Sequence, residues 1–186
     1  MKFGIIKERK NPPDRRVVFT PEELVRLQSE HPEAEIKVES SDIRIFSDDQ
    51  YRNLGLNVTA EMSDCDVLFG VKEVPVDALI PNKKYFFFSH TIKKQPYNRK
   101  LLKAILEKNI ELYDHETIVD ATNHRLIGFG RYAGLVGAYN GFRGFGIKYD
   151  LFTLPKAETL SGKEDLIARL KRQTLPNIKI VLTGHG

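Results

Sequence analysis

The sequence has little cysteine and no long apolar run. Cys65 is the only cysteine among 186 residues, so the chain can form neither an intrachain disulfide nor a zinc site of several cysteines. No apolar run approaches the roughly 18 residues that cross a bilayer, and the longest candidate, 85–88, has the length of a strand. Charge follows Met1 too soon for the apolar region of a signal peptide. We therefore expect a cytoplasmic protein without a membrane partner.

A large excess of charge of one sign is also absent. The sequence has 29 Lys and Arg against 25 Asp and Glu, a formal net charge of +4, and 41% of its residues are hydrophobic. This balance is typical of a globular chain and not of a disordered one. The basic pairs at 83–84 and 93–94 are too short to predict a nucleic-acid interface. The mild positive charge fits an enzyme that handles an acidic small-molecule substrate.

Short apolar runs alternate with helical patterns along most of the chain. The helical patterns begin with Thr20-Pro21, an N-cap followed by proline, and recur at 48–54, 98–108 and 165–172. The runs read as buried strands, which parallel sheets favour because both faces are covered. This order predicts an α/β fold with a parallel sheet. The expected strands are 2–7, 36–39, 66–71, 85–89, 110–113 and 178–182.

A glycine-rich segment, 128–146, interrupts this alternation. Its apolar residues recur at spacings of three and four, which predicts a helix, although a loop is the alternative. Each glycine lowers helix propensity by about 1 kcal/mol, so close packing must hold such a helix. Gly134, Gly137 and Gly141 would form a flat face that another backbone can approach.

The final residues predict the beginning of a second domain. The run 178–182 leads into Gly184-His185-Gly186, as at the start of a dinucleotide-binding strand–helix–strand unit. We expect this chain to be the front of a longer protein that binds NAD or NADP mainly through residues that follow. The expected divisions are a substrate and catalytic domain at 1–127, an interdomain helix at 128–147, a connecting segment with a short helix at 148–175, and the truncated NAD(P)-binding domain at 176–186.

Two proton-active residues follow neighbouring predicted strands. Lys72 comes after the run ending at Val71, and His90 closes the run 85–89. The carboxyl ends of parallel strands share the edge where open α/β sheets bind ligands, and both side chains can transfer protons there. The alternatives are a surface lysine and a histidine bonded to a backbone carbonyl.

Arginines and a cluster of acidic residues and histidines surround these positions. Arg15 and Arg16 follow the first strand, where one of them can grip a carboxylate, or both can be solvated. Arg125 would add positive potential to the same cleft. The cluster matches no strong metal-ligand spacing, so we expect no metal site. Its members are Asp114, His115, Glu116, Asp120 and His124.

These motifs resemble a known family. The segments are Lys7-Glu8, Arg15–Pro21, Gly70–Pro75, Phe88–Gln95 and Phe129–Gly134. They are similar to the N-terminal domain shared by alanine dehydrogenases, the transhydrogenase α subunit and the saccharopine dehydrogenases. The last two segments place the chain nearer the lysine-forming saccharopine dehydrogenases and lysine–2-oxoglutarate reductase.

The resemblance implies a Rossmann-like (flavodoxin-like) parallel sheet for the substrate domain, and it implies roles for particular residues. Lys72 and His90 match the catalytic residues, Arg16 and Arg125 match substrate-binding arginines, and Gly184 and Gly186 match the opening of the nucleotide loop. The implied activity of the full-length protein is NAD(P)-dependent hydride transfer at a C–N bond of an amino acid. Alanine dehydrogenase and a non-catalytic binding module of the same fold are the alternatives. We expect these 186 residues alone to be inactive. We also expect the apolar face of the helix at 128–146 either to drive self-association into a homo-oligomer or to bend back onto the domain.

Overall fold

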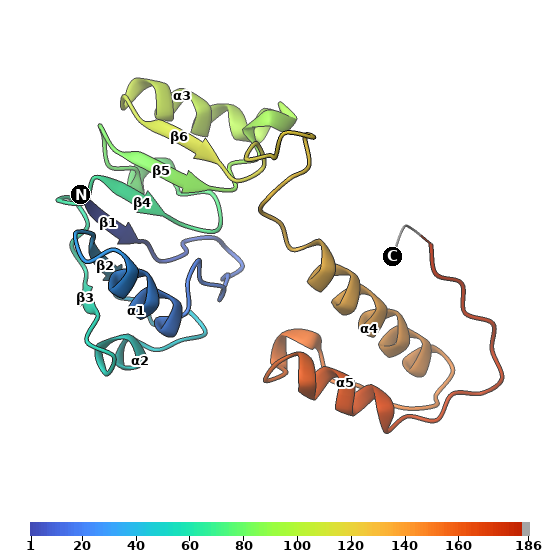
Figure 1. Ribbon diagram of the computed structural model, residues 1–186. Coiled ribbons are helices and arrows are strands. Elements are labelled where there is room, and N and C mark those ends of the chain that lie inside the picture. Colours follow the sequence, from blue (N-terminus) through green and yellow to red (C-terminus); the bar gives the residue numbers. More distant parts are fainter. Residues whose placement is uncertain (184–186) are drawn as a thin grey trace. The chain divides into compact units, whose positions relative to one another are not determined.

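The computed structural model describes residues 1–183, so the predicted cofactor residues Gly184 and Gly186 lie outside the described residues. The chain divides into two compact units, Met1–Gly128 and Phe129–Gly186. Each unit is described here by itself (Figure 1). The finer four-part division of the chain stays a prediction.

The first unit is built on one six-stranded parallel sheet. Its strand order is β3-β2-β1-β4-β5-β6. From β1 the chain first adds β2 and β3 on one side and then β4, β5 and β6 on the other, so the boundary between β1 and β4 is a topological switch point. This sheet confirms the predicted α/β class. The strands are β1 (Lys2–Ile5), β2 (Glu35–Glu39), β3 (Asn57–Thr59), β4 (Val67–Phe69), β5 (Lys84–Phe87) and β6 (Glu111–Asp114).

Local sequence signals explain where the helices of this unit begin. At α1 (Pro21–Glu30) the Thr20 side chain accepts from the Glu23 backbone N–H, and the Glu23 side chain accepts from the Thr20 N–H. This capping box satisfies two backbone donors that a helix start leaves unpaired. Ser47 and Gln50 repeat it at α2 (Asp48–Arg52). The remaining helices are α3 (Arg99–Glu107) and the 3₁₀ turns η1 (Val76–Ala78), η2 (Thr91–Lys93) and η3 (Pro96–Asn98).

Two hydrophobic cores cover opposite faces of the sheet. Adjacent strand residues point to opposite faces, so Leu68 enters one core and Phe69 the other. One core packs α1 and α2 against β1 and β2, and the other packs α3 against β4 and β5 (Figure 1). Both faces near the switch point are therefore fixed, which makes the strand ends rigid platforms for the loops that follow them.

The second unit contains α4 (Gly130–Lys148), η4 (Ala157–Thr159) and α5 (Lys163–Lys171). The glycine-rich segment is thus a helix, as predicted. Its packing differs from expectation, because a Cβ at Gly134, Gly137 or Gly141 would meet no atom within 4 Å. The close approach occurs at Gly146, where a Cβ would lie 2.5 Å from Phe152.

The strand predicted at 178–182 does not form. A strand needs a neighbour to pair its backbone N–H and C=O groups, and the described part of this unit contains no strand. The apolar side chains of residues 178–182 are exposed as a result, and 88% of Leu182 is accessible to solvent. In residues 1–183 no helix is long and apolar enough to cross a membrane.

Candidate functional site

The loops after β1, β4, β5 and β6 meet at the carboxyl edge of the sheet. Arg16 lies in the loop after β1, Lys72 follows β4, His90 follows β5, and Arg125 follows β6. β1, β4, β5 and β6 are consecutive neighbours in the sheet. The four residues predicted from the sequence therefore lie along one edge of the first unit, beginning at the switch point.

Arg16 is held by an acidic neighbour from its own loop. Its Nε donates to Asp14 Oδ1 at 2.9 Å, and its Nη2 donates to Asp14 Oδ2 at 2.5 Å. The hydrogen bond from Arg16 is the main reason that the pKa of Asp14 lies below its ordinary value, and the positive charge of Lys72 lowers it further. Asp14 thus links Arg16 and Lys72 electrostatically.

Glu8 fixes the backbone that carries Lys72. Its carboxylate accepts from the Val71 N–H at 2.7 Å and from the Lys72 N–H at 2.8 Å. Only 7% of Glu8 is exposed. Burial raises the pKa of Glu8, and the two backbone hydrogen bonds oppose that rise.

His90 adopts a left-handed backbone conformation, with φ 56° and ψ 11°. Such a conformation is costly for a residue other than glycine and persists only where its surroundings enforce it. The His90 carbonyl accepts from the Asn98 side-chain amide at 3.1 Å and from the Lys93 N–H at 3.1 Å. These bonds hold the turn that directs the imidazole along the edge.

A carboxylate from the loop after β6 orients the His90 ring. Its Nδ1 lies 2.9 Å from Glu116 Oε2 and 3.1 Å from the Lys93 ammonium. Nδ1 cannot both donate to Glu116 and accept from Lys93, and the carboxylate contact is the shorter. Donation from Nδ1 to Glu116 leaves Nε2 as the nitrogen that can take up a proton.

Glu116 gathers three cationic or proton-active groups. Besides His90, its carboxylate pairs with Lys93 at 3.2 Å and with Arg125 at 3.5 Å. Burial alone would raise the pKa of Glu116, but the hydrogen bonds from His90 and Lys93 outweigh it and hold the pKa below the ordinary value. A short hairpin, closed by a bridge between Val119 and Arg125, returns Arg125 to this carboxylate.

Glu73 joins the two halves of this edge. Its carboxylate lies 3.1 Å from the Lys10 ammonium, and its Oε1 lies 3.9 Å from His90 Nε2. Glu73 follows Lys72 directly in the chain. Arg16, Lys72, His90 and Arg125 thus form a row along the carboxyl edge of the sheet, with the carboxylates of Asp14, Glu73 and Glu116 beside them. Such a row can bind a carboxylate and exchange protons beside it.

Buried polar groups support this row from beneath. Ser89 donates to the Asp114 carboxylate, which also accepts from the Glu116 N–H at 2.9 Å. The His115 ring lies 3.2 Å from the Gly70 carbonyl through Nε2 and meets the Phe88 ring edge-on at 5.0 Å. These contacts tie the exits of β4, β5 and β6 together.

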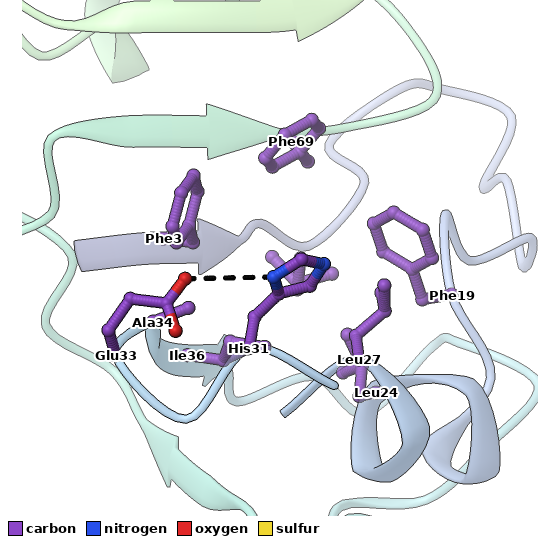
Figure 2. A pocket seen from close by; sticks show the side chains of 10 residues that line it. Phe3, Phe19, Leu24, Leu27, His31, Glu33, Ala34, Ile36 and Phe69 are labelled. Carbon is purple, nitrogen blue, oxygen red and sulfur yellow. Dashed lines mark ion pairs between the residues drawn. The ribbon is translucent and has the colours of Figure 1, made fainter. Parts of the chain in front are cut away.

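An apolar pocket of about 350 Å³ lies elsewhere in the first unit. Figure 2 shows Phe3, Phe19 and Phe69 around it, with His31 and Glu33 paired at 3.6 Å. None of the predicted site residues lines this pocket. Its apolar walls suit hydrophobic side chains, so it is a poor place for an acidic substrate.

Sequence reasoning assigned no role to several residues that shape the site. Glu8, Asp14, Glu73 and Lys93 take part through hydrogen bonds and ion pairs, and Glu116 entered only as a member of an acidic cluster. The available signal was their position, because Glu8, Glu73 and Glu116 each lie within four residues of the carboxyl end of a strand, and Asp14 and Lys93 lie further along the same loops. Within residues 1–183, no three His, Cys, Asp or Glu side chains are grouped so that they could hold a metal ion.

Comparison with known proteins agrees with this arrangement. Residues 4–136 match the family described as the alanine dehydrogenase/PNT N-terminal domain, which is more than half of the chain. The chain belongs to this family. The matched range begins within β1 and includes the other five strands of the sheet and all four site residues of the first unit.

Relatives with assigned names are longer dehydrogenases and synthases. The α-aminoadipic semialdehyde synthase of Arabidopsis thaliana is 35% identical over 147 residues, which is 77% of this chain and 14% of that protein. The lysine-forming, NAD(+) saccharopine dehydrogenase of Candida glabrata is 28% identical over 181 residues, or 94% of this chain and 45% of that protein. The chain thus spans less than half of either relative.

Solved structures share the fold of the family. An L-alanine dehydrogenase superposes with a TM-score of 0.58 at 20% identity, covering 80% of this chain and 41% of that one. A transhydrogenase from Sinorhizobium meliloti gives 0.52 at 15% identity, covering 81% and 44%. At such identities the likeness shows the fold alone.

Proposed function

We propose that the natural protein carrying this chain is an NAD(P)-dependent amino-acid oxidoreductase of the saccharopine dehydrogenase type. The observation that supports this best is the row formed by Arg16, Lys72 and His90 on adjacent loops of an alanine dehydrogenase/PNT N-terminal domain. The named relatives include saccharopine dehydrogenases and α-aminoadipic semialdehyde synthases. In this proposal the chain supplies the substrate side of the site.

Each residue of the row has a task that suits its chemistry. Arg16, fixed by Asp14, and Arg125 bind carboxylates of the substrate. Lys72 and His90 exchange protons with the substrate nitrogen and the carbon-bound oxygen as a C–N bond is formed or broken. Glu116 holds the His90 ring so that Nε2 faces the substrate. The nicotinamide supplies or accepts the hydride.

Activity of the natural protein tests this proposal. Nicotinamide absorbance is followed for three substrate sets, each with the NAD and the NADP form of the cofactor: saccharopine with the oxidised cofactor, lysine and 2-oxoglutarate with the reduced cofactor, and alanine with the oxidised cofactor. We expect turnover with saccharopine or with lysine and 2-oxoglutarate. Turnover with alanine alone would identify an alanine dehydrogenase, and no turnover with any set would favour a binding module.

Substitutions then test the residues. Lys72→Met and His90→Gln should each lower kcat by about 10²- to 10⁴-fold, the usual share of general acid–base catalysis, while nucleotide affinity stays unchanged. Lys103→Met and His31→Gln are matched controls, because both residues are exposed and lie outside the row. Near-normal turnover of both Lys72→Met and His90→Gln would refute the assignment.

A further inference from the structure

Just beyond β4, a side-chain carboxylate accepts the backbone hydrogen bonds of Val71 and Lys72 that a neighbouring strand would otherwise accept. Pairing between β1 and β4 ends at Ile5 and Phe69, and the Ile6 N–H donates once more to the Phe69 carbonyl at 2.9 Å. On the other side, the Gly70 N–H donates to the Phe86 carbonyl at 2.8 Å. The Val71 carbonyl still accepts from the Phe88 N–H at 3.1 Å, but within the described residues the N–H groups of Val71 and Lys72 have no backbone acceptor and need another one.

Glu8 provides that acceptor for both groups at once. One carboxylate oxygen takes the Val71 N–H, and the other takes the Lys72 N–H. Bonds from neutral donors to an ionised acceptor are stronger than neutral ones, and two of them fix orientation as well as distance. Since Glu8 is nearly fully buried, water does not compete for these amides.

We propose that Glu8 is a positioning residue for Lys72, setting where its backbone leaves β4 and hence where its ammonium meets the substrate. The catalytic part of this proposal rests on the proposed function, whereas its geometric part does not. Displacing a catalytic group by about 1 Å costs on the order of 100-fold in rate, so a rigid anchor at this turn matters for turnover.

A second buried carboxylate gives a matched control. Glu39 is 4% exposed, and it accepts from the Lys7 N–H at 2.9 Å and pairs with Arg9. It binds the loop after β1 in the way that Glu8 binds the loop after β4, but it does not contact Lys72. Glu39→Gln therefore removes a buried charge of the same kind, one to which neither the Val71 N–H nor the Lys72 N–H donates among the described contacts.

Amide exchange followed by NMR tests the geometry in this chain. Glutamine offers one oxygen and one NH₂ group, so in Glu8→Gln only one of the two amides keeps its acceptor. We expect exchange at Val71 or Lys72 to accelerate about 10-fold or more. In Glu39→Gln both should exchange as in the wild type. Unchanged exchange at both amides in Glu8→Gln would overturn the proposal, whether or not the protein is an oxidoreductase.

The unaltered chain gives a second reading if Glu8→Gln fails to fold. As pH is lowered, the amide proton shifts of Val71 and Lys72 should move together with the side-chain carboxyl carbon signal of Glu8. If the amide proton shifts of Val71 and Lys72 stay constant while the Glu8 carboxyl signal moves, the proposal is also overturned.

A double-mutant cycle in the natural enzyme tests the link to catalysis. Glu8→Gln should lower kcat about 10- to 100-fold when Lys72 is present. In the Lys72→Met background it should change the residual rate by less than about 2-fold, because its effect acts through Lys72. Equal losses in both backgrounds would show a merely structural role. Absence of any activity would refute the proposed function while leaving the exchange result as the test of the anchor.

Discussion

At the scale of residues, the candidate site depends on glutamates that position the groups assigned to chemistry, Glu8 at the Lys72 backbone and Glu116 at the His90 ring. Lys72, His90 and Arg16 could be proposed as site residues because each side chain can transfer protons or bind a carboxylate, and each follows a strand or matches a family motif. The roles of Glu8 and Glu116 could not, since a glutamate near a strand end carries no sign of the backbone amide or imidazole that it will meet. The left-handed conformation of His90 was also invisible, because it arises from tertiary bonds to its carbonyl.

The two-point hold of Asp14 on Arg16 predicts that lysine cannot replace this arginine. Lysine has a single ammonium and lacks the planar fork that matches a carboxylate at Nε and Nη2. In the natural enzyme, Arg16→Lys should raise KM for the carboxylate substrate about 10- to 100-fold with a smaller change in kcat. Steady-state kinetics measure both.

Arg26→Lys serves as the control for this substitution. Arg26 is a largely exposed residue of α1 whose side chain pairs only with Glu30 among the interactions described for it. It should leave KM within about 2-fold of the wild type, as surface substitutions usually do. A KM for Arg16→Lys equal to that of Arg26→Lys would remove Arg16 from the substrate site.

Burial of His115 predicts acid sensitivity of the fold. Burial lowers the pKa of His115 below its ordinary 6.5, although the hydrogen bond with Gly70 opposes this. The unfolded chain therefore takes up a proton more readily than the folded chain as pH falls below 6.5. The His115 contribution to the free energy of unfolding is complete above 6.5 and declines as pH falls through the interval down to the folded pKa.

Denaturant unfolding measures this contribution. Between about pH 7.5 and about pH 5.5, His115→Phe should lose less unfolding free energy than the wild type, because phenylalanine has no proton to gain. His31→Gln, at an exposed site, is the control for removing a histidine from the first unit. Identical pH slopes for His115→Phe and the wild type would mean that His115 is not held neutral by the fold.

At the scale of elements, capping residues and continuous apolar runs predicted most of the first unit. α1 begins where Thr20 and Pro21 place it, and five strands fall within a few residues of their expected positions. β3 escaped notice because it has three residues and none of them is buried. The strand predicted at 178–182 is absent for a different reason. Its apolar residues favour a strand, but the described part of the second unit has no other strand with which it could pair.

The glycines of α4 predict opposite outcomes for two similar substitutions. Gly146→Ala should destabilise the second unit, because the new Cβ would meet the Phe152 ring and backbone oxygen at 2.5 Å. Gly137→Ala should stabilise it by about 0.5–1 kcal/mol, because alanine favours the helix and its Cβ meets nothing within 4 Å. Denaturant unfolding compares the two directly. A gain in stability for Gly146→Ala would show that α4 does not pack against Phe152.

At the scale of the whole molecule, the first unit shares a strand order with dinucleotide-binding domains but not their phosphate loop. The order 3-2-1-4-5-6 is that of the Rossmann fold. In that fold a glycine-rich turn after the first strand lets the backbone approach the pyrophosphate. Here the connection from β1 to α1, residues 6–20, contains no glycine. It carries Lys10, Arg15 and Arg16 instead, which suits carboxylates held by side chains.

Because the loop after β1 lacks the glycine turn of a nucleotide site, we predict that the 186-residue chain does not bind nicotinamide nucleotides tightly. Pyrophosphate binding needs backbone N–H groups at a helix start that the ligand can reach. At α1 two of the N-terminal donors are already occupied, since the Thr20 N–H and the Glu23 N–H take part in the capping box. Calorimetric titration with NAD and with NADP should therefore show no binding in the micromolar range. Micromolar affinity for either nucleotide would show that a complete cofactor site exists within these residues and would contradict the assignment of the first unit to the substrate alone.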